Sequence, residues 1–401
     1  MELVEIGKLV NPSSTKIVLL VMDGLGGLPR DPKGLTELET AQTPHLDELA
    51  KDGICGLHQV ISSGITPGSG PAHLALFGYD PFRYFIGRGV LEGVGIGFDL
   101  KPEDVAARGN FSTINDEGKV IDRRAGRIST QKNIELSKRL REIKIPGVEI
   151  FIEPIKEYRV LLVLRGEGLS AQIKGTDPQG VNLEISRAEA LSPEAKYTAR
   201  VVNEFTEKAR TVLSGQEPAN MVFFRGFSQR PVLPQMQAVF GINAAAIAQY
   251  PMYKGLSRLV GMDILESGQQ TPQLFETLEK NWGDYDFFYM HVKAIDSAGE
   301  DGDFERKTEL IEEVDQLIPR IMNLNPDVVV VTGDHSTPAF LKQHSWHPVP
   351  VLLWSKYCRP DRVQQFGERD CLAGALGPRL PAVELLPIAL ANAGRLNKYG
   401  A

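Results

Sequence analysis

Two apolar runs of this chain lead into acidic residues, and this pattern constrains the fold more than any other feature. Residues 328–331 are four consecutive valines, and Asp334 and His335 follow shortly after them. Residues 17–22 form a second apolar run, which leads straight into Asp23. Continuous apolar runs are typical of parallel strands buried on both faces, and open α/β sheets bind ligands beyond the carboxyl ends of such strands. The sequence therefore predicts an α/β fold with these polar residues at its functional edge.

The residues around these acids leave a choice between a metal site and ordinary loop structure. Taken alone, Asp334 also fits the N-cap of a helix, and His335 fits a polar loop. Gly24, Gly26 and Gly27 follow Asp23, where they permit a tight turn close to a ligand. Their spacing does not match the dinucleotide-binding fingerprint, and a loop follows them instead of a helix. Asp23 is therefore interpreted as a metal ligand.

Ser69 is a candidate nucleophile because glycines on both sides expose its hydroxyl group. It lies in the segment Thr66–His73, where Gly68 and Gly70 permit a sharp turn and a helix can begin after Pro71. A serine that attacks phosphorus needs a neighbouring base or a divalent cation. The structural alternative is an ordinary loop rich in glycine, proline and serine. His73, four residues later, is expected to steady the site, contact the substrate or move a proton.

Further candidate ligands follow two other apolar runs. Asp296 and Glu300 come after the run that starts at residue 286, and a spacing of four places them on one face of a helix. His344 and His347 precede the run at 349–353. A structural role is the alternative for each histidine, but their position beside strand ends favours a functional site.

The order of these motifs resembles that of the archaeal-type cofactor-independent phosphoglycerate mutases, which belong to the alkaline phosphatase superfamily. The resemblance rests on Asp23 after the first strand, Ser69 in Pro-Gly-Ser-Gly-Pro-Ala-His, and Asp296 in Lys-Ala-Ile-Asp-Ser-Ala-Gly, together with Asp334-His335 and with His344 before Pro-Val-Pro. It implies an α/β fold with an alkaline-phosphatase-like three-layer α/β/α core and an inserted smaller α+β lid domain. The expected core is discontinuous, 1–104 and 216–401, and the expected lid is 105–215.

The resemblance also implies a function. The chain is expected to interconvert 2-phosphoglycerate and 3-phosphoglycerate through a phosphoserine at residue 69, without 2,3-bisphosphoglycerate. Its substrate would be a small phosphorylated carboxylic acid. Two divalent metal ions are implied, with manganese or magnesium favoured and cobalt or zinc as alternatives. One ion would be held by Asp23, Ser69, Asp334 and His335, and the other by Asp296, the residue at position 300 and His344.

Position 300 departs from the family pattern, because Glu300 stands where a histidine is expected. Glutamate is a competent oxygen ligand, and carboxylates suit manganese and magnesium. The extra carboxylate should nevertheless weaken the attraction for phosphate. We expect a second metal site of altered preference, with Asp301 and Asp303 as substitute ligands. The change keeps two alternatives open, a phosphatase or mutase for another phosphorylated metabolite and a noncatalytic paralogue, although Ser69 argues against the latter.

Arginines in the middle of the chain are the expected substrate ligands. Guanidinium groups bind phosphate and carboxylate with paired hydrogen bonds, and phosphoglycerate carries both groups. The candidates are Arg108, Arg123, Arg124 and Arg127, with Lys254 from the core; Arg123 and Lys254 are also expected to act in catalysis. Surface arginines that are simply solvated are the alternative.

Composition excludes several other classes. The net charge of −7 argues against nonspecific nucleic-acid binding. The three cysteines have no metal-like spacing, so a reducing cytoplasm is expected. No apolar run approaches the roughly 20 residues that span a bilayer, so no membrane association is expected. The sequence does not indicate an oligomeric state. Apolar runs predict strands at 16–22, 158–164, 219–224, 286–290, 327–332 and 349–353, and helical spacing predicts helices at 43–49 and 307–322.

Overall fold

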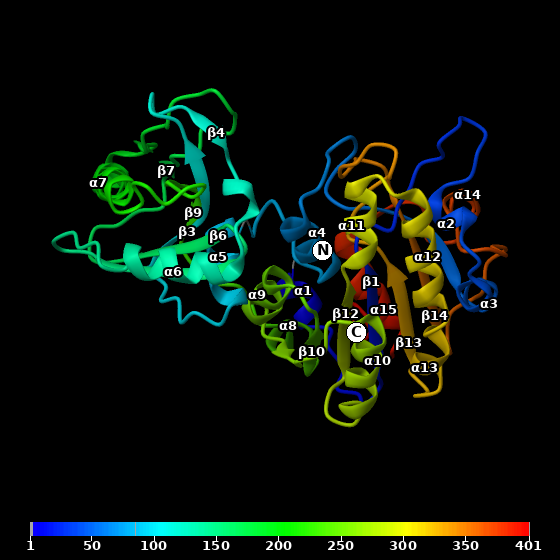
Figure 1. Cartoon of the computed structure of the whole chain (residues 1–401). Coiled ribbons are helices and arrows are strands. Elements are labelled where there is room, and N and C mark those ends of the chain that lie inside the picture. Colours follow the sequence, from blue (N-terminus) through cyan, green and yellow to red (C-terminus); the bar gives the residue numbers. More distant parts are fainter. Residues whose placement is uncertain (1–2, 85, 401) are drawn as a thin grey trace. The chain divides into compact units, whose positions relative to one another are not determined.

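The computed structural model describes residues 3–84 and 86–400, and the chain divides into two compact units (Figure 1). Unit 1 consists of Met1–Phe85 and Leu233–Ala401, and unit 2 is Ile86–Val232. Unit 2 is thus an insertion in the sequence of unit 1. An α/β core with a smaller inserted part agrees with the fold class predicted from the sequence.

Unit 1 is built on one eight-stranded sheet with the order β11-β10-β12-β1-β13-β14-β2-β15. Its centre is parallel, and β14 alone runs antiparallel to both of its neighbours. The long apolar runs predicted as strands form this centre. The strands are β1 (Ile17–Met22), β2 (Ile54–Gln59), β10 (Ala244–Ile247), β11 (Asp263–Ile264), β12 (Phe287–Val292), β13 (Val328–Thr332), β14 (Val349–Ser355) and β15 (Gly377–Pro381).

Helices cover both faces of this sheet, which gives the predicted three layers. Val18 and Leu20 of β1 share a buried cluster with α3 (Pro44–Asp52), α10 (Thr271–Lys280) and α12 (Phe304–Asp315). Side chains of the opposite face meet α4 (Ser69–Leu76) and α15 (Leu385–Asn392). The remaining helices of unit 1 are α1 (Leu3–Gly7), α2 (Glu37–Thr40), α8 (Met236–Phe240), α9 (Pro251–Leu259), α11 (Ala294–Asp301), α13 (Ile318–Met322) and α14 (Glu368–Cys371), with a short 3-10 helix, η3 (Ala382–Glu384).

Unit 2 combines a five-stranded antiparallel sheet with three main helices, as expected for an α+β insertion. The strand order is β4-β3-β6-β5, with β9 paired to the other edge of β3. The strands are β3 (Val105–Ile114), β4 (Val120–Asp122), β5 (Glu149–Lys156), β6 (Arg159–Arg165) and β9 (Met221–Ser228), and β7 (Ile173–Lys174) pairs with β8 (Glu189–Ala190). The helices are α5 (Arg88–Gly95), α6 (Thr130–Leu140) and α7 (Lys196–Val212), with the 3-10 helices η1 (Ala125–Arg127) and η2 (Pro193–Ala195).

Two sequence expectations differ from these boundaries. Residues 86–104 and 216–232 belong to unit 2 instead of the core, because α5 packs on β3 and β9 pairs with β3. The helix expected at 307–322 is two helices, α12 and α13, and Pro319 lies in the first turn of the second. Among the described residues, no helix is long and apolar enough to cross a membrane.

Candidate metal centre

The centre lies where three neighbouring parallel strands end. Strand β1 pairs with β12 on one side and β13 on the other, so their carboxyl ends share one edge of the sheet. Asp23 directly follows β1, Lys293 directly follows β12, and Asp334 lies two residues after β13. Asp23 and Asp334 are fully buried. The sheet topology thus brings together acids that are about three hundred residues apart in the chain.

Asp23, Asp334 and His335 form a first group of converging ligand atoms. The Nε2 atom of His335 lies 3.3 Å from Asp23 Oδ1 and 3.2 Å from Asp334 Oδ2. All three atoms are buried without a hydrogen-bond partner. Buried polar atoms are normally paired, and leaving them unpaired is costly. A divalent cation would satisfy all three atoms, so these residues fit the metal that the sequence implies.

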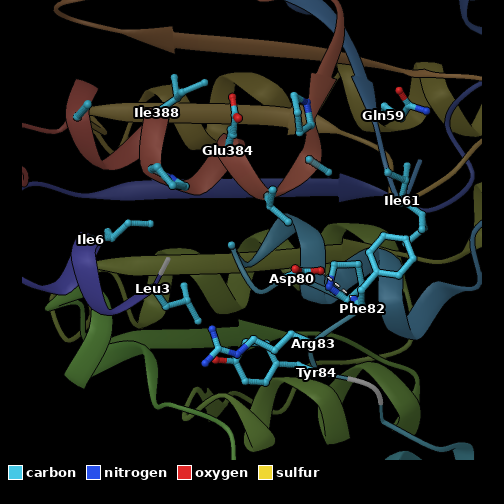
Figure 2. A pocket seen from close by; sticks show the side chains of 18 residues that line it. Leu3, Ile6, Gln59, Ile61, Asp80, Phe82, Arg83, Tyr84, Glu384 and Ile388 are labelled. Carbon is cyan, nitrogen blue, oxygen red and sulfur yellow. Dashed lines mark hydrogen bonds between the residues drawn. The ribbon is translucent and has the colours of Figure 1, made fainter. Parts of the chain in front are cut away.

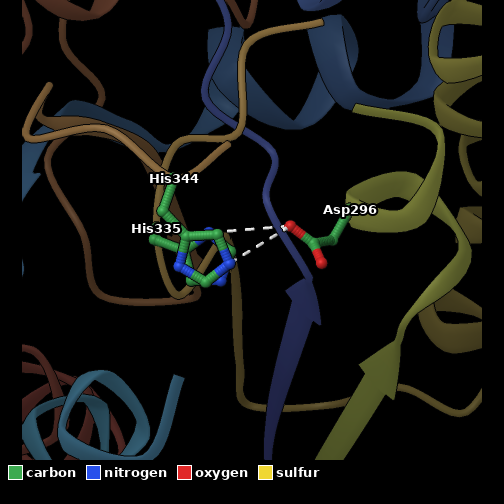
Figure 3. Close-up of side chains that lie close together, drawn as sticks. All are labelled: Asp296, His335 and His344. Atoms are coloured by element: carbon green, nitrogen blue, oxygen red, sulfur yellow. Dashed lines mark ion pairs between the residues drawn. The ribbon is translucent and has the colours of Figure 1, made fainter. Parts of the chain in front are cut away.

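Asp296, His335 and His344 form a second group, shown in Figure 3. Asp296 Oδ1 is 3.8 Å from His344 Nε2 and 3.9 Å from His335 Nδ1. The two imidazole rings stack with their centroids 3.5 Å apart. The hydroxyl group of Thr337 donates to Asp296 Oδ1 at 2.6 Å and lies 2.9 Å from His335 Nδ1. His335 therefore belongs to both groups, whereas the sequence assigned it to one.

Glu300 lies at the margin of this second group. It is in the last turn of α11, its side chain is 55% exposed, and Oε1 is 4.0 Å from His344 Nε2. It is not among the converging ligand atoms, so its role as a ligand stays a prediction. The suggested substitute Asp303 is occupied elsewhere, because its side chain caps α12 by accepting from the Arg306 amide.

Lys293 is a central residue that the sequence reasoning missed. Its Nζ atom lies 3.1 Å from Asp23 Oδ2 and pairs with Asp296 Oδ2. Burial alone would lower the pKa of Lys293, but the two carboxylates raise it well above its usual range. The side chain is therefore an ammonium ion. Its spacing of three residues from Asp296 is the sequence feature that could have predicted this ion pair.

The charge states of the acids differ because their neighbours differ. Burial alone would raise the pKa of Asp23, but Lys293 and His291 outweigh it and hold that pKa well below the usual range. Burial and the nearby charge of Asp23 raise the pKa of Asp334 well above its usual value. Asp23 also accepts a 2.6 Å hydrogen bond from the Tyr253 hydroxyl.

Ser69 is the first residue of α4 and is linked to both acids. The Tyr253 hydroxyl group, which donates to Asp23, is also in hydrogen-bonding reach of the Ser69 side chain. His73 Nδ1 lies 2.8 Å from the Ser69 carbonyl oxygen and 3.4 Å from Asp334 Oδ2. Burial lowers the pKa of His73 to about 3, so the ring is neutral. Because His73 is completely buried, its position favours support of the serine over contact with substrate.

Lys254 belongs to the same unit but pairs away from these acids. It lies on α9 beside Tyr253, and its ammonium group donates to Glu266 Oε2 at 2.6 Å. Its predicted contact with substrate and its role in catalysis stay predictions.

The candidate arginines all belong to unit 2, where two of them are held by acids. Arg123 makes paired hydrogen bonds of 3.1 and 2.8 Å to Asp177. Arg108 is buried 3.9 Å from Glu92, and burial lowers its pKa to about 10. Two arginines that were not predicted, Arg88 and Arg225, act electrostatically on Arg108, and Arg225 lies 3.7 Å from Asp177. Arg124 and Arg127 are exposed.

A separate cavity of about 830 Å³ lies elsewhere in unit 1 (Figure 2). It is lined mainly by apolar side chains such as Leu3, Ile6 and Ile388, and it contains none of the candidate ligands. Size alone therefore does not locate the chemistry of this protein. The converging unpaired atoms are the stronger indication.

Known proteins match the chain over nearly its full length. The sequence model of the family described as 2,3-bisphosphoglycerate-independent phosphoglycerate mutase matches residues 50–220. A probable enzyme of this name from Thermus thermophilus is 50% identical over 399 residues, 98% of each chain. One from Thermotoga maritima is 51% identical, over 99% of this chain and 98% of the relative. This chain belongs to the 2,3-bisphosphoglycerate-independent phosphoglycerate mutase family.

Solved structures agree with membership in this mutase family. A Pyrococcus horikoshii protein matches with a TM-score of 0.83 at 30% identity, over 96% of this chain and 99% of that protein. The cofactor-independent phosphoglycerate mutase of Thermoplasma acidophilum matches with a TM-score of 0.70 at 29% identity, over 94% of this chain and all of that one. The resemblance inferred from the ordered motifs is thereby confirmed at the level of the family and the fold.

Proposed function

We propose that this chain interconverts 2-phosphoglycerate and 3-phosphoglycerate without 2,3-bisphosphoglycerate, with Ser69 as the transient phosphoryl acceptor. The observation that carries the proposal is the convergence of unpaired Asp23 Oδ1, Asp334 Oδ2 and His335 Nε2 beside the serine. The names of the relatives support the substrate, a small phosphorylated carboxylic acid.

The residues of the centre would hold two divalent ions. Asp23, Asp334 and His335 with Ser69 would bind one ion, and Asp296, His344 and Glu300 the other. The many carboxylates favour manganese or magnesium, and the histidines also suit cobalt or zinc. When bound, such ions lower the pKa of a serine hydroxyl group and stabilise charge on the phosphoryl oxygens.

The proposed reaction balances within the protein and substrate. Ser69 Oγ attacks phosphorus, the bond from phosphorus to the glycerate oxygen breaks, and the proton lost by the serine ends on that oxygen. The other glycerate hydroxyl group then attacks the phosphoserine, and Ser69 regains a proton. The arginines of unit 2 would hold the glycerate between these steps, and unit 2 would act as a lid that excludes water. Arg123 and Lys254 are proposed to contact the phosphate.

A phosphatase for another phosphorylated metabolite would share the first half of this reaction. The exposed position of Glu300 favours keeping this second candidate, because a weaker second metal site would alter the transfer. In a phosphatase, water would attack the phosphoserine and release inorganic phosphate.

An enolase-coupled assay tests both candidates. Metal-stripped protein is resupplied with manganese, magnesium, cobalt or zinc and given 3-phosphoglycerate without 2,3-bisphosphoglycerate, and free phosphate is measured in parallel. We expect formation of 2-phosphoglycerate that is lost in Ser69→Ala. Phosphate release without 2-phosphoglycerate would favour the phosphatase, and no turnover of 3-phosphoglycerate by folded protein with any of the metals would refute the mutase.

A further inference from the structure

The ammonium group of Lys293 lies between the two halves of the centre. It contacts Oδ2 of Asp23 and Oδ2 of Asp296. These are not the oxygens that face the candidate metal positions, because Asp23 turns Oδ1 toward His335 and Asp296 turns Oδ1 toward His344. Each carboxylate thus offers one oxygen to a metal position and the other to the lysine.

With Glu300 counted as the proposed ligand, the charge balance of the centre favours such a cation. Asp23, Asp296, Glu300 and Asp334 together carry four negative charges when ionised, and two divalent ions carry four positive charges. A centre of this composition has no net charge with which to attract a phosphoryl group. Lys293 adds one positive charge inside the centre, and so offsets the glutamate at the position where a neutral histidine was expected.

We propose that Lys293 is a built-in third cation of the centre, which supplies the net positive charge that binds the phosphoryl group. The inference rests on the proposed two-metal function. An ammonium group has three N–H donors. One donates to Asp296 Oδ2, and Asp23 Oδ2 is an ion-pair partner at 3.1 Å, so the two carboxylates occupy at most two donors. The third donor is available for a phosphoryl oxygen, and the side chain is 27% exposed, so the group is not sealed from a ligand.

Removal of Lys293 should change metal affinity in the opposite direction from removal of a residue that only holds the carboxylates in place. Removing a cation from between two carboxylates lowers the repulsion that an incoming divalent ion meets, so metal binding should tighten. Phosphate binding should weaken, because a positive charge and a donor are lost. Loss of a mere tether would loosen the carboxylates and would weaken metal binding as well.

Calorimetry on Lys293→Met distinguishes the two roles. Manganese is titrated into metal-stripped protein, and inorganic phosphate into the manganese-loaded protein. We expect two bound ions with an affinity above that of the wild type, and phosphate binding roughly 10- to 100-fold weaker, as for loss of a charged hydrogen bond. Lys356→Met is the matched control, since Lys356 pairs with Asp327 outside the centre. It should change neither affinity.

A second pair of variants tests the link to Glu300. Glu300→Gln removes one negative charge, so it should restore part of the phosphate affinity in the Lys293→Met background, and Lys293→Arg should keep most of it. Unchanged phosphate affinity in Lys293→Met with two ions bound, or weaker manganese binding, would overturn the inference. A wild-type protein that binds no manganese would instead overturn the proposed function, and this inference with it. If Lys293→Met does not fold, Glu300→Gln alone must tighten phosphate binding.

Discussion

At the scale of single residues, the centre contains carboxylates that repel one another. It also contains buried polar atoms that have no hydrogen-bond partner. Asp23 is stabilised as a carboxylate by Lys293 and His291, while Asp334 is disfavoured as a carboxylate by burial and by Asp23. The repulsion between these carboxylates is relieved only when a further positive charge binds among them. The geometry therefore fits a cation site better than a buried structural network.

His58 gives a prediction for the dependence of stability on pH. It is fully buried on β2 with Nε2 3.0 Å from the Gly333 carbonyl oxygen, and burial lowers its pKa to about 4. An unfolded histidine has a pKa of about 6.5, so below that pH the His58 ring binds a proton in the unfolded state but stays neutral in the folded state. Stability should therefore fall as the pH drops from 6.5 toward 4.

Urea denaturation of the wild type and His58→Gln at pH 7.5 and 5 measures this effect. Between the two pH values the wild type should lose about 2 kcal/mol more than the variant, because glutamine does not titrate. Equal losses would show that His58 is protonated in the folded protein or does not contribute.

Sequence reasoning located some of these residues and missed others for a physical reason. Asp23, Asp334 and His335 were predictable because they follow buried strands, whose ends the periodicity marks. Tyr253 was not assigned a role, since its bond to Asp23 joins residues 230 positions apart and depends on how α9 lies against the sheet. Lys293 was missed because a lysine is not a usual metal ligand, and its contact with Asp23 depends on the pairing of β1 with β12.

At the scale of elements, helix α12 holds the two loops that carry the candidate metal ligands. Its buried Lys307 donates to the carbonyl oxygens of Gly26 at 3.1 Å and Thr337 at 2.9 Å. The first loop follows Asp23, and the second follows His335. One ammonium group therefore fixes both loops relative to each other.

Lys307→Met should weaken manganese binding about tenfold or more, as is typical when the support of metal ligands is removed. The thermal unfolding temperature should fall too, because the Thr337 carbonyl group loses the Lys307 donor and the Gly26 carbonyl group keeps only the Thr337 amide. Arg306→Met is the control, since it removes the same charge from an exposed position of the same helix. Manganese affinity that is equal in both variants would contradict this role.

Helix α5 and strand β3 approach closely at Gly89 in unit 2. A Cβ atom there would lie 2.3 Å from the Ala106 carbonyl oxygen, whereas at Gly93 it would meet the flexible Leu100 side chain at 2.9 Å. Gly89→Ala should destabilise unit 2 by about 1–3 kcal/mol, and Gly93→Ala should be far milder. Hydrogen exchange of the β3 amides measures the difference, and equal exchange in both variants would refute the close packing.

At the scale of the whole molecule, the candidate metal ligands belong to unit 1 and the candidate substrate arginines to unit 2. Metal binding should therefore survive changes in unit 2. Arg225→Met should leave two manganese ions bound but raise the KM for 3-phosphoglycerate roughly tenfold or more, because it removes one of the positive charges that are proposed to hold the glycerate. Arg139→Met is the comparison, since Arg139 is exposed on α6 of the same unit and pairs with Glu135. Loss of manganese in Arg225→Met would contradict this division.

The sequence predicted the architecture more reliably than it predicted the limits of unit 2 and of individual helices. The apolar runs specified the central strands, and the ordered motifs specified the family and the insertion. The limits of unit 2 were misplaced because β9 pairs with β3 across more than one hundred residues, and strand pairing over such a distance leaves no local pattern. One helix was predicted at 307–322 where the structure has two. Proline breaks the interior of a helix but is tolerated in a first turn, and Pro319 lies in the first turn of α13.

Ser69 as the phosphoryl carrier predicts that the transferred phosphate can be found on the protein. Manganese-loaded wild type and Ser69→Ala are mixed with 3-phosphoglycerate, quenched in acid within a turnover, digested and analysed by mass spectrometry. We predict phosphate on the peptide that contains Ser69 in the wild type and none in the variant, while both proteins bind manganese. Formation of 2-phosphoglycerate by Ser69→Ala, or phosphate on a different residue, would rule out Ser69 as the phosphoryl carrier.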